Sequence, residues 1–250
     1  MIQGDYMLHI PNVNIAIAGK IRSAKTFCSD LLVKNHNYSK LSFATPLKKM
    51  LKLAREEWWW ELHDMIYNGP IPVSVGTGRY GFASEAVKSI VHYWADHWGD
   101  KDFISGKGRD FLQFLGTDYF RKQWPDYWVQ WFADTLNKLP AYQMIPGTGL
   151  VPISTPPFVV DDVRFPNELE MLKRHGFLTL RCDIDDADRL ARVKPEDLPF
   201  VWHPSECALD ECSDMFDGVI DTSVAIEDQY AVLVDAINTA YQNKQGPEEN

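Results

Sequence analysis

The sequence lacks any apolar run close to the ~20 consecutive residues that a membrane-spanning helix needs. It has only four cysteines among 250 residues, Cys28, Cys182, Cys207 and Cys212, and they form no Cys-x-x-Cys pair. No secretory signal sequence is recognisable. We therefore expect no membrane partner, reduced thiols and a cytoplasmic location.

Basic residues are fewer than acidic residues. The chain carries 25 Lys and Arg against 35 Asp and Glu, which gives a formal net charge of −10. This balance argues against a protein that grips nucleic acid over a broad surface, but it leaves room for a small basic pocket. With 45% hydrophobic residues, we expect one large domain, or a core with inserted subdomains.

One glycine is missing from an otherwise familiar stretch, Asn14 to Leu32. The apolar run Ile15–Ala18 predicts a buried strand, Gly19 ends it, and Lys25-Thr26 open an amphipathic helix. Strand, tight loop and helix with Lys-Thr at the helix start is the layout of a phosphate-binding loop, G-x-x-x-x-G-K-[ST]. Ala24 replaces the second glycine, a mild departure that would weaken nucleotide binding. The alternative is an ordinary strand–turn–helix with a chance Lys-Thr.

Further strands complete an α/β pattern. Phe158–Asp162 is an apolar run that ends in two acids, the arrangement in which a strand-end carboxylate faces Mg²⁺. A helix follows, and Phe177–Cys182 is the next strand, so this is a βαβ unit. We also expect strands at Tyr38–Phe43 and Gly218–Asp221, and thus a mostly parallel central sheet flanked by helices.

The middle of the chain has helical periodicity. Arg109 and Gln113 share a helix face, and Arg121 lies further on; two arginines aimed at one spot can fork onto phosphate oxygens. Alternatively, they are solvated or paired with nearby Asp residues. The run Trp58–Trp60 favours core packing, with at least one ring on a neighbouring subdomain or partner. Gly-rich loops are expected at 68–81, where Gly76-x-Gly78 is too weak to indicate a phosphate site, and at 99–108.

We predict these segments: a core with the phosphate loop over 12–44, a helical insertion over 45–149, core again over 150–182, a lid-like charged segment over 183–203, core over 204–242, and a disordered tail over 243–250. His203, Cys207 and Cys212 do not have the spacing of a zinc site.

Together these pieces resemble a bacteriophage deoxynucleoside monophosphate kinase. The likeness spans residues 14 to about 240 and rests on five stretches: the phosphate loop with Arg22-Ser23; Phe43-Ala44-x-Pro46-Leu47-Lys48; Arg109-x-x-Leu112-Gln113-x-Leu115-Gly116-Thr117-Asp118; Asp162-x-Arg164-x-x-x-Glu168; and His203-x-Ser205-Glu206 with Gly218-Val219-Ile220-Asp221. The resemblance implies a P-loop kinase fold with an inserted helical monophosphate-binding part and a lid. It also implies transfer of the γ-phosphate of ATP to a deoxynucleoside monophosphate, and family habit favours a homodimer.

The resemblance assigns roles by position. The ATP-binding residues would be Gly19, Arg22, Ser23, Ala24, Lys25, Thr26, Phe27, Arg189 and Arg192. The monophosphate would contact Phe43, Ala44, Lys48, Arg109, Gln113, Trp128, Arg164 and Glu168, with Trp128 stacking on the base. Thr26 and Asp162 would hold Mg²⁺, and catalysis would rest on Lys25, Arg109, Arg121, Asp162 and Arg164. The motif around His203 has no assigned role, and Thr222 stands where an Asn is expected.

The predicted reaction is in-line transfer from MgATP to a phosphate oxygen that is already mostly dianionic at neutral pH, so no general base is needed. Two alternatives stay open. One is a P-loop kinase whose acceptor is a hydroxyl of a nucleoside or modified DNA base, with Asp162 as base. The other is a catalytically silent nucleotide-binding module, which Ala24 and the tryptophan run motivate.

Overall fold

The computed structural model describes residues 8–70, 78–96, 109–139, 142–145, 149–152 and 155–246. Its chain divides into two compact units, one formed by residues 1–42 and 140–250 and the other by Phe43–Leu139. The loop predicted at 99–108 lies outside the described residues, as do residues 71–77 of the loop predicted at 68–81, which include Gly76, and the last four residues of the tail. The loop prediction is wrong for residues 78–81, because a helix begins at Gly78. Among the described residues, no helix is long and apolar enough to cross a membrane.

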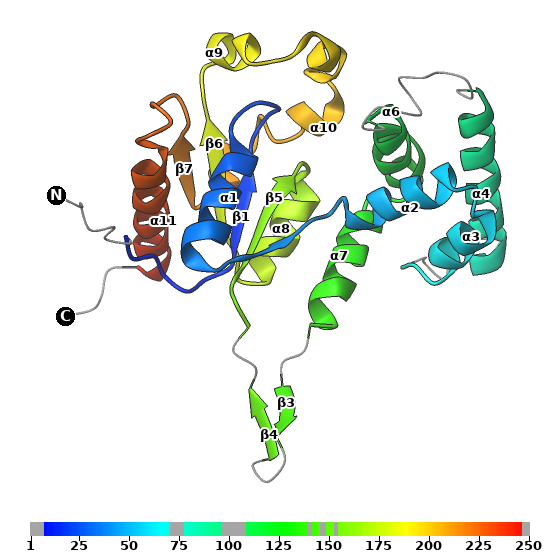
Figure 1. Ribbon diagram of the computed structural model, residues 1–250, viewed down its shortest axis with the longest axis horizontal. Helices are drawn as coiled ribbons and strands as arrows, with labels where there is room; N and C mark the ends of the chain where they lie inside the picture. Colours follow the sequence, from blue (N-terminus) through cyan, green and yellow to red (C-terminus); the bar gives the residue numbers. More distant parts are fainter. Residues whose placement is uncertain are drawn as a thin grey trace. The chain divides into compact units, whose positions relative to one another are not determined.

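The first unit is built on a five-stranded, all-parallel sheet with strand order β2-β5-β1-β6-β7 (Figure 1). Its strands are β1 (Ile15–Ala18), β2 (Ser39–Leu41), β5 (Phe158–Val163), β6 (Leu178–Asp183) and β7 (Gly218–Asp221). The α/β class and the parallel sheet are therefore confirmed. The central strand β1 pairs with β5 and β6, with a register irregularity against β5 between Ala16 and Ala18.

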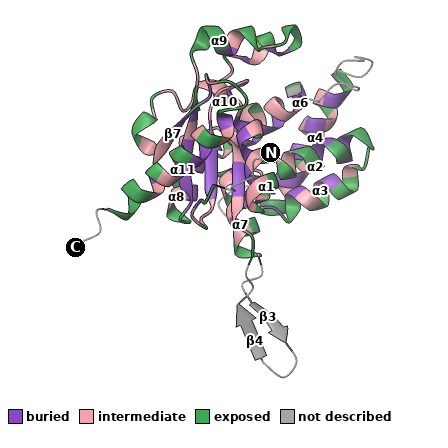
Figure 2. Cartoon of the chain, turned by 60° about the vertical axis from the view of Figure 1, so that its left-hand side comes forward, coloured by how far each residue is buried: buried purple, intermediate pink, exposed green. Residues whose placement is uncertain are grey.

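Three longer helices flank this sheet: α1 (Lys25–His36), α8 (Pro166–Arg174) and α11 (Gln229–Gln245). Helices α1 and α11 contact each other. Right-handed crossovers run from β1 to β2 and from β5 to β6 in opposite directions along the sheet, so they place α1 and α8 on opposite faces. Ile15 and Ile17 join the core under α1 and α11 with Leu32 and Leu233. Figure 2 shows the fully buried residues gathered in the sheet and the inner helix faces.

The segment between β6 and β7 contains short helices: α9 (Asp186–Ala191) and η2 (Pro195–Phe200) lie in the predicted lid-like stretch 183–203, and α10 (Pro204–Cys207) and η3 (Ser213–Met215) follow it. The predicted disordered tail begins too early, because α11 continues through Gln245. Lys244 Nζ holds this last turn by donating to the Phe177 carbonyl at 2.9 Å and to Asp217 at 2.8 Å. A two-stranded antiparallel pair that the sequence did not predict, β3 (Tyr142–Ile145) and β4 (Gly149–Pro152), also belongs to this unit.

The second unit is helical: α2 (Thr45–Arg55), α3 (Trp59–Tyr67), α4 (Gly78–Asp96), α6 (Arg109–Gln113), the π-helix η1 (Phe114–Arg121) and α7 (Tyr127–Asn137). Its core is rich in aromatic rings, with Phe120 stacked on Tyr127 and edge-on to Trp128. Trp59 packs against this core as expected. Trp58 and Trp60 do not; they are 50% and 72% exposed.

Candidate functional site

The loop between β1 and α1 lies after the middle strand of the sheet. In open α/β sheets, ligands bind at the carboxyl ends of the strands, near the point where the strand order reverses. Gly19, Arg22 and Ala24 all have positive φ angles, 147°, 65° and 62°. Ala24 is also the left-handed N-cap of α1. A left-handed conformation costs an L-residue roughly 1–2 kcal/mol, so this loop is strained at two non-glycine positions.

Lys25 is the most unusual residue of the loop. Its side chain is buried, and its Nζ donates a 2.6 Å hydrogen bond to the Lys20 carbonyl. Burial, and to a smaller extent the nearby Arg164 charge, lower the pKa of Lys25 from 10.5 to about 7, although Glu206 and Asp161 oppose this. A buried amine whose pKa is strongly shifted by desolvation and by neighbouring charges is a marker of functional sites. Thr26, the next residue, is exposed.

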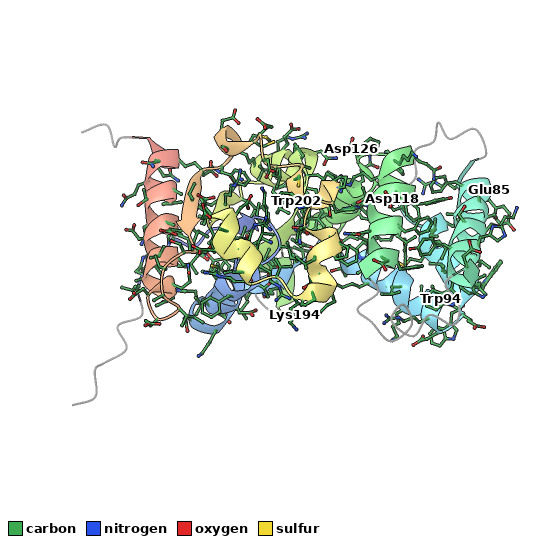
Figure 3. The ribbon with its side chains drawn as sticks, turned by 90° about the horizontal axis from the view of Figure 1, so that it is seen from above. Glu85, Trp94, Asp118, Asp126, Lys194 and Trp202 are labelled. Carbon is green, nitrogen blue, oxygen red and sulfur yellow. The ribbon has the colours of Figure 1, made fainter. Side chains whose placement is uncertain are left out.

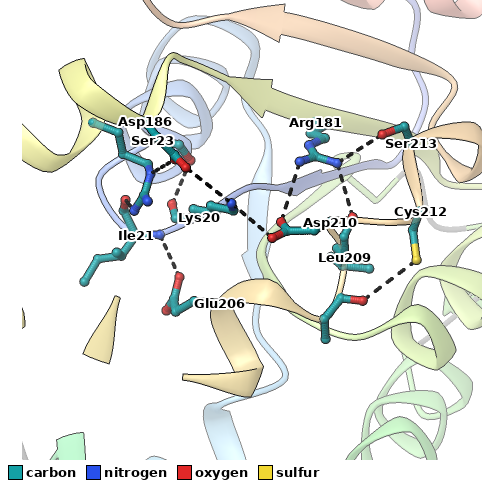
Figure 4. A network of polar contacts seen from close by, with 12 residues as sticks. Lys20, Ile21, Ser23, Arg181, Asp186, Glu206, Leu209, Asp210, Cys212 and Ser213 are labelled. Carbon is teal, nitrogen blue, oxygen red and sulfur yellow. Dashed lines mark hydrogen bonds and ion pairs between the residues drawn. The ribbon is translucent and has the colours of Figure 1, made fainter. Parts of the chain in front are cut away.

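Glu206 binds directly to the backbone of the loop. Its Oε2 accepts a 2.6 Å hydrogen bond from the Ile21 N–H and forms an ion pair with Arg164 Nη1. Upstream, His203 caps α10, because its Nδ1 accepts a hydrogen bond from Ser205 N. The motif His203-x-Ser205-Glu206, which had no role from the sequence, thus places a carboxylate against the loop (Figure 4).

The other cations of the loop also pair with acids from the segment 186–210. Arg22 Nη2 lies 2.6 Å from Asp197 Oδ2, and Lys20 Nζ lies 3.1 Å from Asp210 and 3.9 Å from Asp186. Figure 4 shows Lys20 between Asp186 and Asp210, with Arg181 on the far side of Asp210. Four carboxylates therefore surround the loop where an anionic ligand would otherwise be expected.

Arg189 is buried beside this loop, with an exposed fraction of only 1%. Its Nε donates to Asp186 at 2.8 Å and its Nη1 to the Ile21 carbonyl at 3.4 Å, while Nη2 is buried and has no hydrogen-bond partner. Arg192 is exposed, and its Nη1 donates a 3.4 Å hydrogen bond to the Thr222 carbonyl. Thr222 is itself buried and donates to the Asp183 carbonyl at 2.9 Å. This contact ties the ends of β6 and β7 together.

The two acids at the end of β5 have different contacts, as expected for successive strand residues. Asp161 Oδ2 lies 2.6 Å from Ser29 Oγ on α1 and 3.3 Å from Lys40 Nζ. Burial opposes ionisation of Asp161, but the Ser29 hydrogen bond and Lys40 outweigh it and lower its pKa. Asp162 Oδ2 instead accepts a 2.7 Å hydrogen bond from Ser42 Oγ. Asp161, which was not among the predicted site residues, is the acid directed toward α1 and Lys25.

The Glu168 carboxylate is used within the fold. Its side chain is buried, and its Oε2 accepts hydrogen bonds from the Arg164 and Phe165 amides at 2.7 and 3.1 Å. These contacts cap α8, so they are a structural use of the carboxylate. The structure thus gives Glu168 a capping role, and its contact with a sugar or phosphate stays a prediction, whereas Arg164 lies at the loop through Glu206.

In the helical unit, two predicted substrate residues are core residues. Trp128 is 2% exposed and its Nε1 donates to the Gly116 carbonyl at 2.9 Å. Phe43 is 4% exposed and stacks on Phe132 at 4.2 Å between centroids. Neither ring has a face open to a base, so the stacking prediction for Trp128 is wrong.

The remaining predicted acceptor residues are more accessible. Lys48 is exposed, Ala44, Gln113 and Arg121 are half-buried, and Arg121 Nη1 donates to the Pro125 carbonyl at 3.1 Å. The side chain of Arg109 lies outside the described residues. Gln113 is the N-cap and Arg121 the last residue of the π-helix η1, a rare helix type that is frequent at functional sites.

The loop-side residues thus form one cluster within the sheet unit: Gly19, Arg22, Ser23, Ala24, Lys25, Arg164 and Arg189 from the prediction, and Lys20, Asp161, Asp197 and Glu206 in addition. Phe27 is half-buried on α1. No group of three or more metal-ligating His, Cys, Asp or Glu side chains occurs among the described residues.

No family model matches the chain, and no curated protein matches it significantly. Function therefore has to be inferred from the loop, its neighbours and the motifs.

Proposed function

We propose that this chain is a nucleotide kinase that transfers the γ-phosphate of MgATP to a deoxynucleoside monophosphate. The observation that carries the proposal is Lys25: a buried amine at the first turn of α1, behind a left-handed loop at the carboxyl edge of a parallel sheet. Free N–H groups at such a helix start favour phosphate oxygens. A phosphate would also stabilise the charged form of Lys25, whose pKa is about 7 without one.

The side chains around the loop suit phosphoryl transfer, which needs positioning and charge neutralisation more than covalent chemistry. Lys25, Arg164 and Arg22 supply cationic groups, and Ser23 Oγ holds the loop by donating to the Lys20 carbonyl at 2.8 Å. To receive a polyphosphate, Arg22 must exchange Asp197 for phosphate oxygens. The acids of the segment 186–210 then act as competitors that the substrate displaces.

A magnesium ion would fit at the start of α1. Mg²⁺ binds through one or two protein oxygens plus substrate phosphates, and Thr26 and Asp161 offer a hydroxyl and a carboxylate there. Ser29 links them, because its Oγ lies 2.9 Å from the Thr26 carbonyl and 2.6 Å from Asp161 Oδ2. The ion would neutralise charge on the transferred phosphate. We assign Asp161 rather than Asp162 to this position, because Asp161 is hydrogen-bonded to Ser29 on α1, whereas Asp162 is hydrogen-bonded to Ser42.

The acceptor site is proposed to use the accessible residues of the helical unit, Lys48, Gln113 and Arg121, together with Arg109. Arginine forks match phosphate oxygens. The motif resemblance supports this assignment, and the base preference of the acceptor is left to experiment.

The test is a coupled ADP-release assay with MgATP against each deoxynucleoside monophosphate, with deoxynucleosides and duplex DNA alongside. We expect turnover on at least one monophosphate and loss of turnover, by at least 1,000-fold, in Lys25→Met with the fold retained. Arg121→Ala should lower kcat/KM at least 30-fold, and Lys34→Met, an exposed change on the same helix as Lys25, should be neutral. Turnover on nucleosides or DNA alone would move the acceptor to a hydroxyl. ATP binding without any turnover would make the chain a binding module.

A further inference from the structure

An exposed tryptophan, Trp202, lies next to the loop cluster. Its side chain is 62% exposed, although a ring of this size is normally sheltered. The backbone on both sides of it is fixed: Val201 is buried, and Glu206 binds the loop amide of Ile21. Trp202 is therefore held in place with much of its surface open. Figure 3 labels it among the side chains of this unit.

Two cations of the loop cluster lie against the indole ring. Lys20 Nζ is 6.0 Å and the Arg189 guanidinium carbon 5.9 Å from the ring centroid. These are cation–π distances. Both cations also line a cavity of about 200 Å³ together with Ser23, Asp186 and residues 181–184 at the end of β6. The ring does not line this polar cavity itself, but it lies against two of the residues that do.

The size and lining of the cavity indicate what it can hold. Clefts that enclose a whole drug-sized ligand measure about 300–1,000 Å³, so this cavity takes only part of a nucleotide. Lys20, Arg181 and Arg189 provide cationic groups, and the buried Arg189 Nη2 has no hydrogen-bond partner. The same cations are paired with Asp186 or Asp210, so an anionic occupant must displace these carboxylates, as at Arg22. An anionic part of a nucleotide would then occupy the cavity, and its base would remain outside, where the aromatic ring is.

We infer that Trp202 is the base-stacking platform of the donor nucleotide, a purine nucleoside triphosphate whose phosphates reach the loop through this cavity. The inference rests on the proposed function and adds to it a residue that determines donor affinity. Stacking on a flat indole needs one open ring face and tolerates either purine. Donor recognition then lies with a residue directly before the His203-x-Ser205-Glu206 motif, and ATP and GTP should bind with similar affinity.

The test compares equilibrium binding of MgATP and of inorganic tripolyphosphate, a polyphosphate of the same length without a base, both with saturating Mg²⁺, by calorimetry. Trp202→Ala should weaken MgATP binding at least 10-fold and change tripolyphosphate binding less than 2-fold. Trp202→Phe, which keeps an aromatic face, should stay within about 3-fold of wild type for both. Trp60→Ala removes another exposed tryptophan, from the helical unit, and should change neither affinity. Thermal unfolding of each variant within 2 °C of wild type shows that the fold is kept.

Several results would overturn the inference. Equal losses for MgATP and tripolyphosphate in Trp202→Ala would mean that the ring acts by holding Lys20 and Arg189, not by stacking. Unchanged MgATP affinity in Trp202→Ala, with tripolyphosphate bound normally by wild type, would remove Trp202 from the site and leave the proposed kinase intact. A wild-type protein that binds neither compound would overturn the proposed function as well as the stacking platform.

Discussion

The ammonium group of Lys25 donates a 2.6 Å hydrogen bond to the backbone carbonyl of Lys20, five residues earlier. The contact closes the loop over a side chain that has almost no access to water. A lysine held in this way is costly to keep charged, and the energetic consequences can be measured without any substrate.

The first prediction concerns stability and pH. Because burial lowers the pKa of Lys25 to about 7 in the fold and it is about 10.4 in the unfolded chain, the unfolded state binds more protons between these values. The contribution of Lys25 to the free energy of unfolding therefore rises with pH across this window. Lys25→Met should stabilise the protein by about 1 kcal/mol or more at pH 6.5, and the gain should shrink toward pH 10.

Urea unfolding of Lys25→Met at several pH values measures this. Lys34→Met, an exposed change on the same helix, is the matched control and should show no such trend. A Lys25→Met gain that is independent of pH would mean that Lys25 keeps an ordinary pKa in the fold.

The second prediction concerns the pair between Arg22 and Asp197. Asp197 has a side-chain exposure of 10% and holds Arg22 at 2.6 Å, so a phosphate must compete with it. Asp197→Asn keeps the shape but removes the charge, and tripolyphosphate should then bind about 3- to 10-fold more tightly in calorimetry. Arg22→Ala combined with Asp197→Asn should abolish this gain. If Asp197→Asn binds no more tightly than wild type, Arg22 has no part in phosphate binding.

The third prediction separates the two adjacent acids of β5. Asp161 is bonded to Ser29 on α1, whereas Asp162 is bonded to Ser42. If the carboxylate on the α1 side assists Mg²⁺, Asp161→Asn should lower kcat/KM at least 100-fold and raise the Mg²⁺ concentration for half-maximal rate. Asp162→Asn should cost less than 10-fold. The reverse order at saturating Mg²⁺ would restore Asp162 as the functional acid and favour a hydroxyl acceptor.

The fourth prediction concerns Ala24, which adopts φ 62° at the N-cap of α1. Glycine removes the steric strain of this conformation but adds entropy to the unfolded chain. Ala24→Gly should therefore raise the free energy of unfolding by about 0.5 kcal/mol in urea titrations. Ala18→Gly, in the extended strand β1, should instead destabilise. A destabilised Ala24→Gly would show that the alanine methyl packs favourably despite its backbone angle.

Much of the fold was predictable, because short apolar runs mark the strands and helical periodicity marks the helices. The apolar run before Gly19, the acids after Val160 and the last short strand at Gly218 all lie in the sheet as expected. Glu206, Asp197 and Asp210 could not be placed at the loop, because their partners lie about 175–190 residues away and such contacts leave no local pattern. Only the motif around His203 singled out Glu206, and it did not predict that Glu206 contacts the loop.

The errors have equally physical causes. Trp128 and Phe43 were expected at a substrate, but large rings gain most when they are buried. Trp128 lies in the aromatic core of the helical unit, and Phe43 is buried against Phe132. Asp161 was passed over because a sequence does not show which of two neighbouring strand residues faces a given helix. Successive strand residues point to opposite faces of the sheet, but the sequence does not show which of the two faces α1.

The division of the chain has a consequence for how the protein is made. The sheet unit is assembled from two stretches separated by the helical unit, and the central strand β1 must wait about 140 residues for its neighbour β5. At ribosomal speeds of about 5–20 residues per second, Ile15–Ala18 is synthesised on the order of ten seconds before it can pair. Residues 43–139 are continuous and can fold within that interval. The most apolar strand of the sheet is therefore also the one that stays unpaired longest during synthesis, which makes it the point where nascent chains are most exposed to aggregation.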